Sequence, residues 1–307
     1  MIIGDVGAYE ADDIRKIVDR VLRDLGNPEP PLNLAQVRAL YELDLRYYSV
    51  ADPGFLQEMK HRVRMAGRNL SERPMLLIEA IRKANLSALW IPDTKRILID
   101  ETVPKAKHRW IEGHEIGHSL IPWHHEFLFG DNDVTLDPAC HAVVEAEANY
   151  ASARLLFLQD KFGTEARDRD LNFASVKAMA KRYGNTLTST FWRMIEDREP
   201  DRAIFGMMTA HPFHPHIGTG ANGEVIRYFI RSPAFKGRFS NVTPEQGYAF
   251  IRKHATPRSK GPVFDATDVL VDDRGEAHEF LFDSFCNQHS LLTIGAHLQP
   301  KPIVAAI

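Results

Sequence analysis

The motif H-E-x-x-H at residues 114–118 constrains this chain more than any other feature. On an α-helix, residues four apart lie on one face, one turn apart, so His114 and His118 can bind one metal ion together. Glu115 then lies beside them, where its carboxylate can reach a water at the ion without being a ligand. The motif therefore predicts a helix over 104–121 that ends at Pro122, since proline cannot continue the helical hydrogen bonds. It also indicates the chemistry of a zinc hydrolase, in which a glutamate takes a proton from the attacking water.

Two residues compete for the place of the third protein ligand. His124 stands six residues after His118, where the pattern H-E-x-x-H-x-x-G-x-x-H has its last histidine. That pattern has glycine at the position that Ile121 holds here, and a β-branched residue resists the sharp turn that glycine allows. Glu145 is the other candidate and lies on a separate segment. The spacing leaves His124 open as an alternative ligand.

The segment around Glu145 has the composition of a long, largely buried helix. Residues 141–158, HAVVEAEANYASARLLFL, are rich in Ala, Leu and Glu. Asn149 follows Glu145 by one turn on the same face, so that Glu145 would bind the metal and Asn149 would hydrogen-bond the free ring nitrogen of a ligand histidine. Glu147 lies about 200° around the helix from Glu145, and we expect it to point elsewhere. His141 is a further substitute ligand, but a helix-end histidine is the simpler interpretation.

Composition and charge exclude several classes of protein. The chain has 307 residues, of which 44% are hydrophobic and 26% charged, as is typical of a soluble globular protein. A net charge of −3 does not indicate chain-wide binding to nucleic acid or to an anionic membrane. The two cysteines, Cys140 and Cys286, are too few and too distant for a disulfide framework or a Cys-rich zinc site. The N-terminus lacks the basic and apolar regions of a signal peptide, and no apolar run is long enough to span a bilayer, so we expect a cytoplasmic protein.

The order of helix and strand patterns predicts three parts. Residues 1–160 form the first domain, 161–204 a helical connector with a helix-turn-helix-like hairpin, and 205–307 a C-terminal α+β domain of sensory or regulatory role. The elements predicted in the first domain are helices at 9–25 and 33–43, a strand at 45–50, a basic helix at 53–70, and a hairpin at 87–100 before the motif helix. The C-terminal part has strand patterns, a turn at 272–275, and a helix capped by Thr243 and Gln246.

Two further segments carry weaker signals. In the hairpin, we expect strand 97–100 to lie at the edge of its sheet, where an extended peptide could pair with it. His211, His214 and His216 lie in HPFHPHIGTG. The prolines exclude a regular helix there, and loop histidines are usually solvated or bonded to the backbone, so we do not expect a second metal.

Two stretches around the motif show a shared order of elements. RILIDETVPKAKHRWIEGHEIGHSLIPWH contains a strand, a short connector and the H-E-x-x-H helix, and VEAEANYASARLLF contains E-x-x-A-N in an alanine-rich helix. Together they resemble the ImmA/IrrE family of metallopeptidases, closely over residues 75–160 and more loosely over 160–200. The resemblance implies the zinc ligands His114, His118 and Glu145 and the general base Glu115.

The resemblance also implies a function. Members of the family act on bacterial or phage repressors, so this chain is expected to be a zinc-dependent endopeptidase, with Mn²⁺ as a substitute ion. Its substrate would be a helix-turn-helix repressor, whose cleavage switches on a phage, mobile-element or stress regulon. The chain departs from the family at Ala151, where an aromatic residue is usual, and at Phe157-Leu158, where Met-Pro is usual. These departures affect packing more than metal chemistry, and they mark a divergent member.

The expected fold class is α+β. It combines a mainly helical, zincin-like metallopeptidase domain that has a small sheet with the connector and the C-terminal α+β domain. Two other functions stay open. One is a catalytically silent regulator with the same fold. The other is a DNA-binding transcription factor acting through residues 173–195, although Leu187, Phe191 and Trp192 favour a plain hairpin packed on a core.

Overall fold

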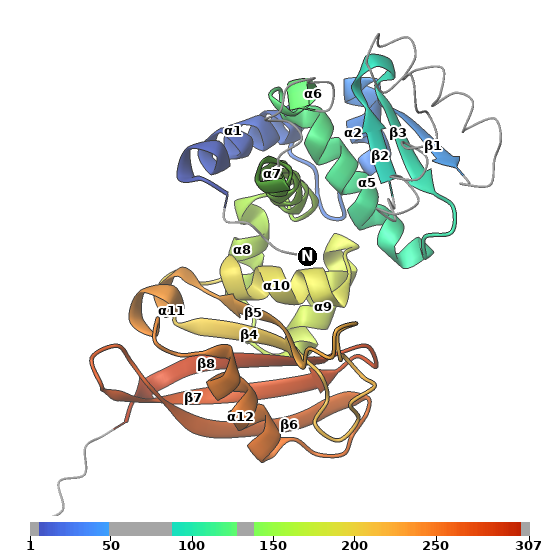
Figure 1. Cartoon of the computed structure of the whole chain (residues 1–307). Coiled ribbons are helices and arrows are strands. Elements are labelled where there is room, and N and C mark those ends of the chain that lie inside the picture. Colours follow the sequence, from blue (N-terminus) through green and yellow to red (C-terminus); the bar gives the residue numbers. More distant parts are fainter. Residues whose placement is uncertain (1–5, 49–87, 128–137, 302–307) are drawn as a thin grey trace, which may run out of the picture. The chain divides into compact units, whose positions relative to one another are not determined.

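The computed structural model describes residues 6–48, 88–127 and 138–301, and within them the fold is α+β (Figure 1). The chain forms two compact units. The first comprises Met1–Gln159 with Tyr183–Asn185, and the second comprises Asp160–Arg182 with Thr186–Ile307. None of the helices in the described ranges has both the length and the apolar character needed to cross a membrane.

The first unit combines helices with a three-stranded sheet. Its helices are α1 (Ala8–Asp24), α2 (Leu34–Tyr41), α5 (Lys105–Leu120), α6 (His124–Phe127) and α7 (Pro138–Leu156), and its strands are β1 (Asp44–Tyr48), β2 (Ala88–Ile91) and β3 (Arg96–Asp100). The helices predicted at 9–25, 33–43 and 141–158 are confirmed, and so are the hairpin and the motif helix. The predicted helix at 53–70 lies outside the described residues.

The sheet has the order β1-β3-β2, with β1 parallel and β2 antiparallel to β3. The prediction that 97–100 is an edge strand is therefore wrong, because β3 lies in the centre. Ile97, Leu98 and Ile99 are all buried, as a strand covered on both faces requires. Among the described strands, β2 lies at one edge and β1 at the other.

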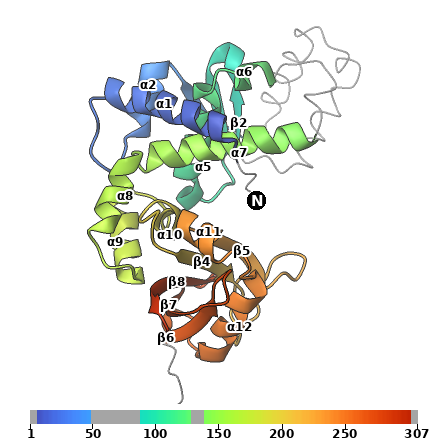
Figure 2. The same ribbon diagram turned by 90° about the vertical axis from the view of Figure 1, so that its left-hand side faces the viewer.

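Helix α5 lies between this sheet and α7, and it contacts β2, β3 and α7 (Figure 1). Glycine makes the approach to α7 close, because a Cβ atom at Gly117 would lie 2.7 Å from the backbone oxygen of Ala148. The helix ends at Leu120, and Ile121 is extended with φ −89° and ψ 110°, as expected for a residue before proline. Figure 2 shows α7 along its length, with α1 against it.

The first two helices follow directly from their sequences. Asn33 caps α2 by accepting a hydrogen bond from the backbone N–H of Ala35. The apolar face of α1 is buried, and each of its side chains contributes about 1.5–3 kcal/mol to folding. That face consists of Ile14, Val18, Val21 and Leu22.

The second unit is built on a five-stranded antiparallel sheet of order β5-β4-β8-β7-β6. Its strands are β4 (Ile204–Thr209), β5 (Ile226–Arg231), β6 (Gly261–Val271), β7 (Ala277–Cys286) and β8 (Leu291–Pro300), and its helices are α8 (Asp160–Arg167), α9 (Phe173–Tyr183), α10 (Leu187–Glu196), α11 (Pro233–Arg238) and α12 (Pro244–His254). The predicted cap of α12 is confirmed as a full capping box.

Strand β4 is covered on both faces. Phe205 and Met207 belong to the aromatic core that α11 and α12 close, whereas Gly206 on the other face lies against Phe191 and Ile195 of α10. Helix α10 is thus part of this unit. Of the helices expected as a separate connector at 161–204, α10 packs on β4 and β5 and α8 contacts α10, so these helices group with the C-terminal sheet.

Candidate metal centre

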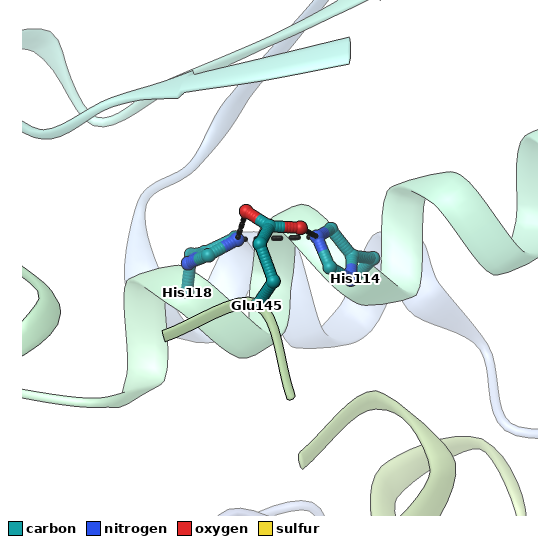
Figure 3. Close-up of side chains that lie close together, drawn as sticks. All are labelled: His114, His118 and Glu145. Atoms are coloured by element: carbon teal, nitrogen blue, oxygen red, sulfur yellow. Dashed lines mark hydrogen bonds and ion pairs between the residues drawn. The ribbon is translucent and has the colours of Figure 1, made fainter. Parts of the chain in front are cut away.

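Three donor side chains from two helices converge in the first unit (Figure 3). His114 and His118 extend from successive turns of α5, and Glu145 reaches them from α7. The two histidine Nε2 atoms are 3.1 Å apart. Glu145 turns one oxygen to each ring, with Oε2 3.2 Å from Nε2 of His114 and Oε1 3.4 Å from Nε2 of His118.

The three side chains could hold a divalent metal ion such as zinc. Zn²⁺ binds nitrogen and oxygen at about 2.0–2.2 Å, so two ligand atoms of a tetrahedral site lie about 3.3–3.5 Å apart. The two Nε2 atoms are 3.1 Å apart, and each lies within 3.4 Å of a different oxygen of Glu145, so the three side chains are near enough to reach one ion. Three donors leave the fourth corner of the tetrahedron for water or substrate, which is the arrangement of a catalytic site.

Asn149 fixes the orientation of one ring. Its Oδ1 lies 3.2 Å from Nδ1 of His114, and its Nδ2 donates a hydrogen bond of 2.8 Å to the carbonyl oxygen of Glu145. Because the amide nitrogen of Asn149 donates to Glu145, its oxygen faces the ring and accepts a hydrogen bond from the Nδ1–H of His114. The Nε2 lone pair of His114 then points into the group of donors, which is the role predicted for Asn149.

Glu115 is buried beside the same donors and accepts a hydrogen bond from the backbone N–H of Trp90 in β2. Burial raises its pKa to about 7, and the charge of Glu145 adds to this rise, while His114 and the Trp90 N–H oppose it. A carboxyl group with a pKa near neutrality can exchange protons with a water or a leaving group at physiological pH.

The protonation of the donors depends on their burial and on one another. Burial lowers the pKa of His118 to about 4. Burial also acts to lower the pKa of His114, but hydrogen bonds and charges from Glu145 and Glu115 outweigh it and hold that pKa above its ordinary value. For Glu145, burial is outweighed by the two histidines, so its pKa is lowered and it is a carboxylate. The cluster therefore offers a negative oxygen donor to a cation.

Solvent reaches the donors from the side of Glu145. The Glu145 side chain is 41% exposed, compared with 15% for His114 and 7% for His118. A water or a substrate can therefore approach the cluster, while the α5 side is closed by packing.

His124, the alternative ligand, lies on the opposite side of the His118 ring from Glu145. Its Nδ1 is 3.0 Å from Nδ1 of His118, whereas the Nε2 atom of His118 faces the donors. Glu147 does point away from Glu145, but its side chain is buried against His124 and Trp123. We did not predict that contact from the sequence. The alanines that flank Glu147 and indicate burial were the available signal. The side chain of His141 lies outside what the structure describes.

A second group of donor side chains is found in the second unit, where Asp272, Glu276 and His278 lie together. Arg238 occupies the place that a cation would take. Its Nε lies 3.3 Å from Oδ2 of Asp272 and its Nη2 3.0 Å from Nε2 of His278. This group is therefore an ion-pair network that holds the β6–β7 turn.

The histidine-rich loop uses its rings to bind backbone. Nε2 of His211 lies 2.9 Å from the carbonyl oxygen of Arg258, and Nε2 of His214 lies 2.7 Å from that of Pro257. A ring nitrogen that donates to a carbonyl oxygen is not free to bind a metal. These contacts agree with the expectation of backbone-bonded loop histidines.

Comparisons with known proteins bear on the fold. No protein-family model matches the chain, and no curated protein matches it. Among solved structures, a Mycobacterium tuberculosis transcriptional regulator is similar with a TM-score of 0.52, over 94% of this chain and 76% of that chain, at 12% sequence identity. At this identity the similarity concerns the fold alone, and it agrees with an α+β architecture.

Proposed function

We propose that this chain is a zinc-dependent metalloendopeptidase whose first unit is zincin-like. The observation that carries the proposal is the convergence of His114, His118 and Glu145, whose nearest donor atoms lie 3.1–3.4 Å apart, with Glu115 buried next to them. The resemblance of the same residues to the ImmA/IrrE pattern supports it. Mn²⁺ is a substitute ion, because this donor set accepts several divalent metals.

Each residue has a defined role in peptide hydrolysis. His114, His118 and Glu145 hold the ion. When bound, Zn²⁺ supplies Lewis-acid chemistry to a water and to the substrate carbonyl. Glu115 takes a proton from the attacking water and returns it to the leaving amine, and its pKa of about 7 suits both transfers.

Strand β2 is positioned to bind the substrate. It lies at an edge of the described sheet, and the Trp90 N–H in it already bonds the general base. An extended peptide that pairs with this strand would place its backbone beside Glu115 with little demand on side chains. This role replaces the one predicted for 97–100.

The proposed substrate is a helix-turn-helix transcriptional repressor, as the family resemblance implies. The similar solved structure is named a transcriptional regulator, which agrees with a role in gene control. Cleavage of the repressor would switch on a phage, mobile-element or stress regulon.

The test compares the wild-type chain with Glu115→Gln in cells by labelling all protein N-termini. Glu115→Gln keeps the ligands, so zinc content should be unchanged, while the loss of the base should remove cleavage. We expect new N-termini within a repressor that appear only with the wild type. Identical sets of termini from the two zinc-loaded proteins contradict the proposal.

The alternative is a regulator without catalysis, which the name of the similar structure favours. A transcriptional response that persists in Glu115→Gln would support it. DNA recognition by α9 and α10 has less support, because one face of α10 is buried. That face consists of Thr190, Phe191, Met194 and Ile195.

A further inference from the structure

A row of hydrogen-bonded side chains extends from His118 into the protein, away from the donor cluster. Nδ1 of His118 lies 3.0 Å from Nδ1 of His124. Nε2 of His124 lies 2.8 Å from Oε2 of Glu147, and Nε1 of Trp123 donates a hydrogen bond of 2.7 Å to the same oxygen. The row thus links α5, the turn after it, α6 and α7.

The two central side chains of the row are buried. His124 is 0% exposed and Glu147 is 3% exposed. A carboxyl group and an imidazole that are buried away from solvent must be paired with each other or with other polar groups, because an unpaired buried charge is strongly destabilising. Besides their contact with each other, His124 bonds to His118 and Glu147 bonds to Trp123.

The proton positions in the row follow from its two ends. At one end, an indole N–H can only donate, so Glu147 accepts from Trp123. At the other end, a neutral His118 that offers Nε2 to a metal carries its proton on Nδ1. That proton points at Nδ1 of His124, which must accept it. His124 then carries its own proton on Nε2, and this N–H donates a hydrogen bond to Glu147. One arrangement of protons thus satisfies all three hydrogen bonds of the row.

We infer that His124 and Glu147 are positioning residues of the metal centre. They hold the His118 ring with Nε2 toward Glu145, and the carboxylate makes His118 a stronger donor through His124. His114 has a simpler, neutral partner in Asn149. The inference rests on the proposed function, since it assigns the support of one of the proposed ligands.

A purely structural role would give the same contacts, in which Glu147 would only attach α6 to α7. The two roles differ in what the carboxylate does for the metal. Glu147→Gln keeps the shape and an oxygen that accepts from His124 and Trp123, but it removes the charge. Glu147→Leu removes both bonds. Glu112→Gln is the matched control, because Glu112 also forms a part-buried ion pair in the first unit, 2.7 Å from Nε of Arg38, away from this row.

The first measurement is the affinity of each full-length variant for Zn²⁺, by competition with a chromophoric chelator. Loss of a partner of a ligand histidine typically weakens binding about 10–100-fold. We expect a loss in that range for Glu147→Leu, about tenfold for Glu147→Gln, and no more than about twofold for Glu112→Gln. Thermal unfolding of the metal-free proteins reports stability separately, and the isosteric Gln variant keeps the test open if the Leu variant does not fold. Folded Glu147 variants that bind Zn²⁺ as tightly as the wild type overturn the inference.

The second measurement reads the protons directly. In the zinc-loaded wild type, ring ¹⁵N NMR should show the N–H of His118 at Nδ1 and that of His124 at Nε2. A His124 ring with its proton on Nδ1 overturns the assignment. If the wild type binds no Zn²⁺, the proposed function fails; if it binds Zn²⁺ but the Glu147 variants do so equally, only this inference fails.

Discussion

At the scale of single residues, a cation entering the site must displace protons. In the metal-free protein, the pKa of His114 is held above its ordinary value and that of Glu115 is raised to about 7. The pKa of His118 is about 4, and the pKa of Glu145 is lowered, so neither carries a proton near neutrality. Protons therefore compete with the metal at His114 directly, and at Glu115 because a nearby cation favours the carboxylate.

We predict that zinc binding at about pH 6 displaces protons from His114 and Glu115, that these two displacements diminish as the pH rises, and that the affinity for zinc rises with pH over this range. Isothermal titration calorimetry in buffers of different ionisation enthalpy gives the number of protons released. In Glu115→Gln, the contribution of residue 115 is absent, so fewer protons should be released at about pH 6. A number of released protons that does not change with pH contradicts this account.

The residues of the site differed in how far the sequence could predict them. The spacing of His114 and His118 was sufficient, because both lie on one helix. Glu145 needed the family resemblance, since spacing along a chain does not tell which helix lies across from another. His124 was predicted as an alternative ligand, but its ring lies against Nδ1 of His118, away from the donors. Its partner Glu147 depends on the rotation of α7 about its axis, which only tertiary packing sets.

At the scale of elements, the site depends on how closely α5 and α7 approach. We predict that Gly117→Ala separates them, because its Cβ would lie 2.7 Å from the backbone oxygen of Ala148, which cannot rotate away. Overpacking of this kind costs about 1–3 kcal/mol. Since Glu145 lies one turn before Ala148, zinc affinity should fall about tenfold, or by about 1.4 kcal/mol. Chemical denaturation and chelator competition measure the two effects.

Gly237→Ala in α11 is the matched control. No atom lies within 4 Å of a Cβ at that position, so the substitution should gain roughly 0.5–1 kcal/mol from helix propensity and leave zinc affinity unchanged. If the two substitutions change stability or zinc affinity equally, close packing of α5 against α7 does not determine these properties.

Elements with a clear period were predictable, and those without one were not. The charged and apolar residues of 9–25 repeat at helical spacing, and α1 is present there. Strand β4 has no alternation, because all six of its residues are buried, and its segment was not predicted as a strand. The hairpin β2–β3 was predicted, but the sequence did not show which of its two strands lies at the edge of the sheet, because β1 pairs with β3 from a distant part of the chain.

At the scale of the whole molecule, we predicted a first domain over residues 1–160, and the first compact unit contains Met1–Gln159. Composition did not show which unit the helices after it belong to. The apolar residues of α10 are equally consistent with a hairpin and with a cover for a sheet, and the choice depends on β4, which lies beneath it.

The placement of the donors within one unit leads to the last prediction. His114, His118 and Glu145 all belong to the first unit, so metal binding should stabilise that unit. At a free zinc concentration of 100 times Kd, the gain is about 2.7 kcal/mol. Hydrogen exchange with Zn²⁺ or with a chelator should therefore show slower exchange in α5 and α7, and β6, β7 and β8 should be unaffected. The variant Glu145→Ala should lose the effect, whereas Asp272→Asn, in the arginine-bound group of the second unit, should keep it. Protection by zinc that appears in β6–β8 and survives Glu145→Ala would place the metal elsewhere.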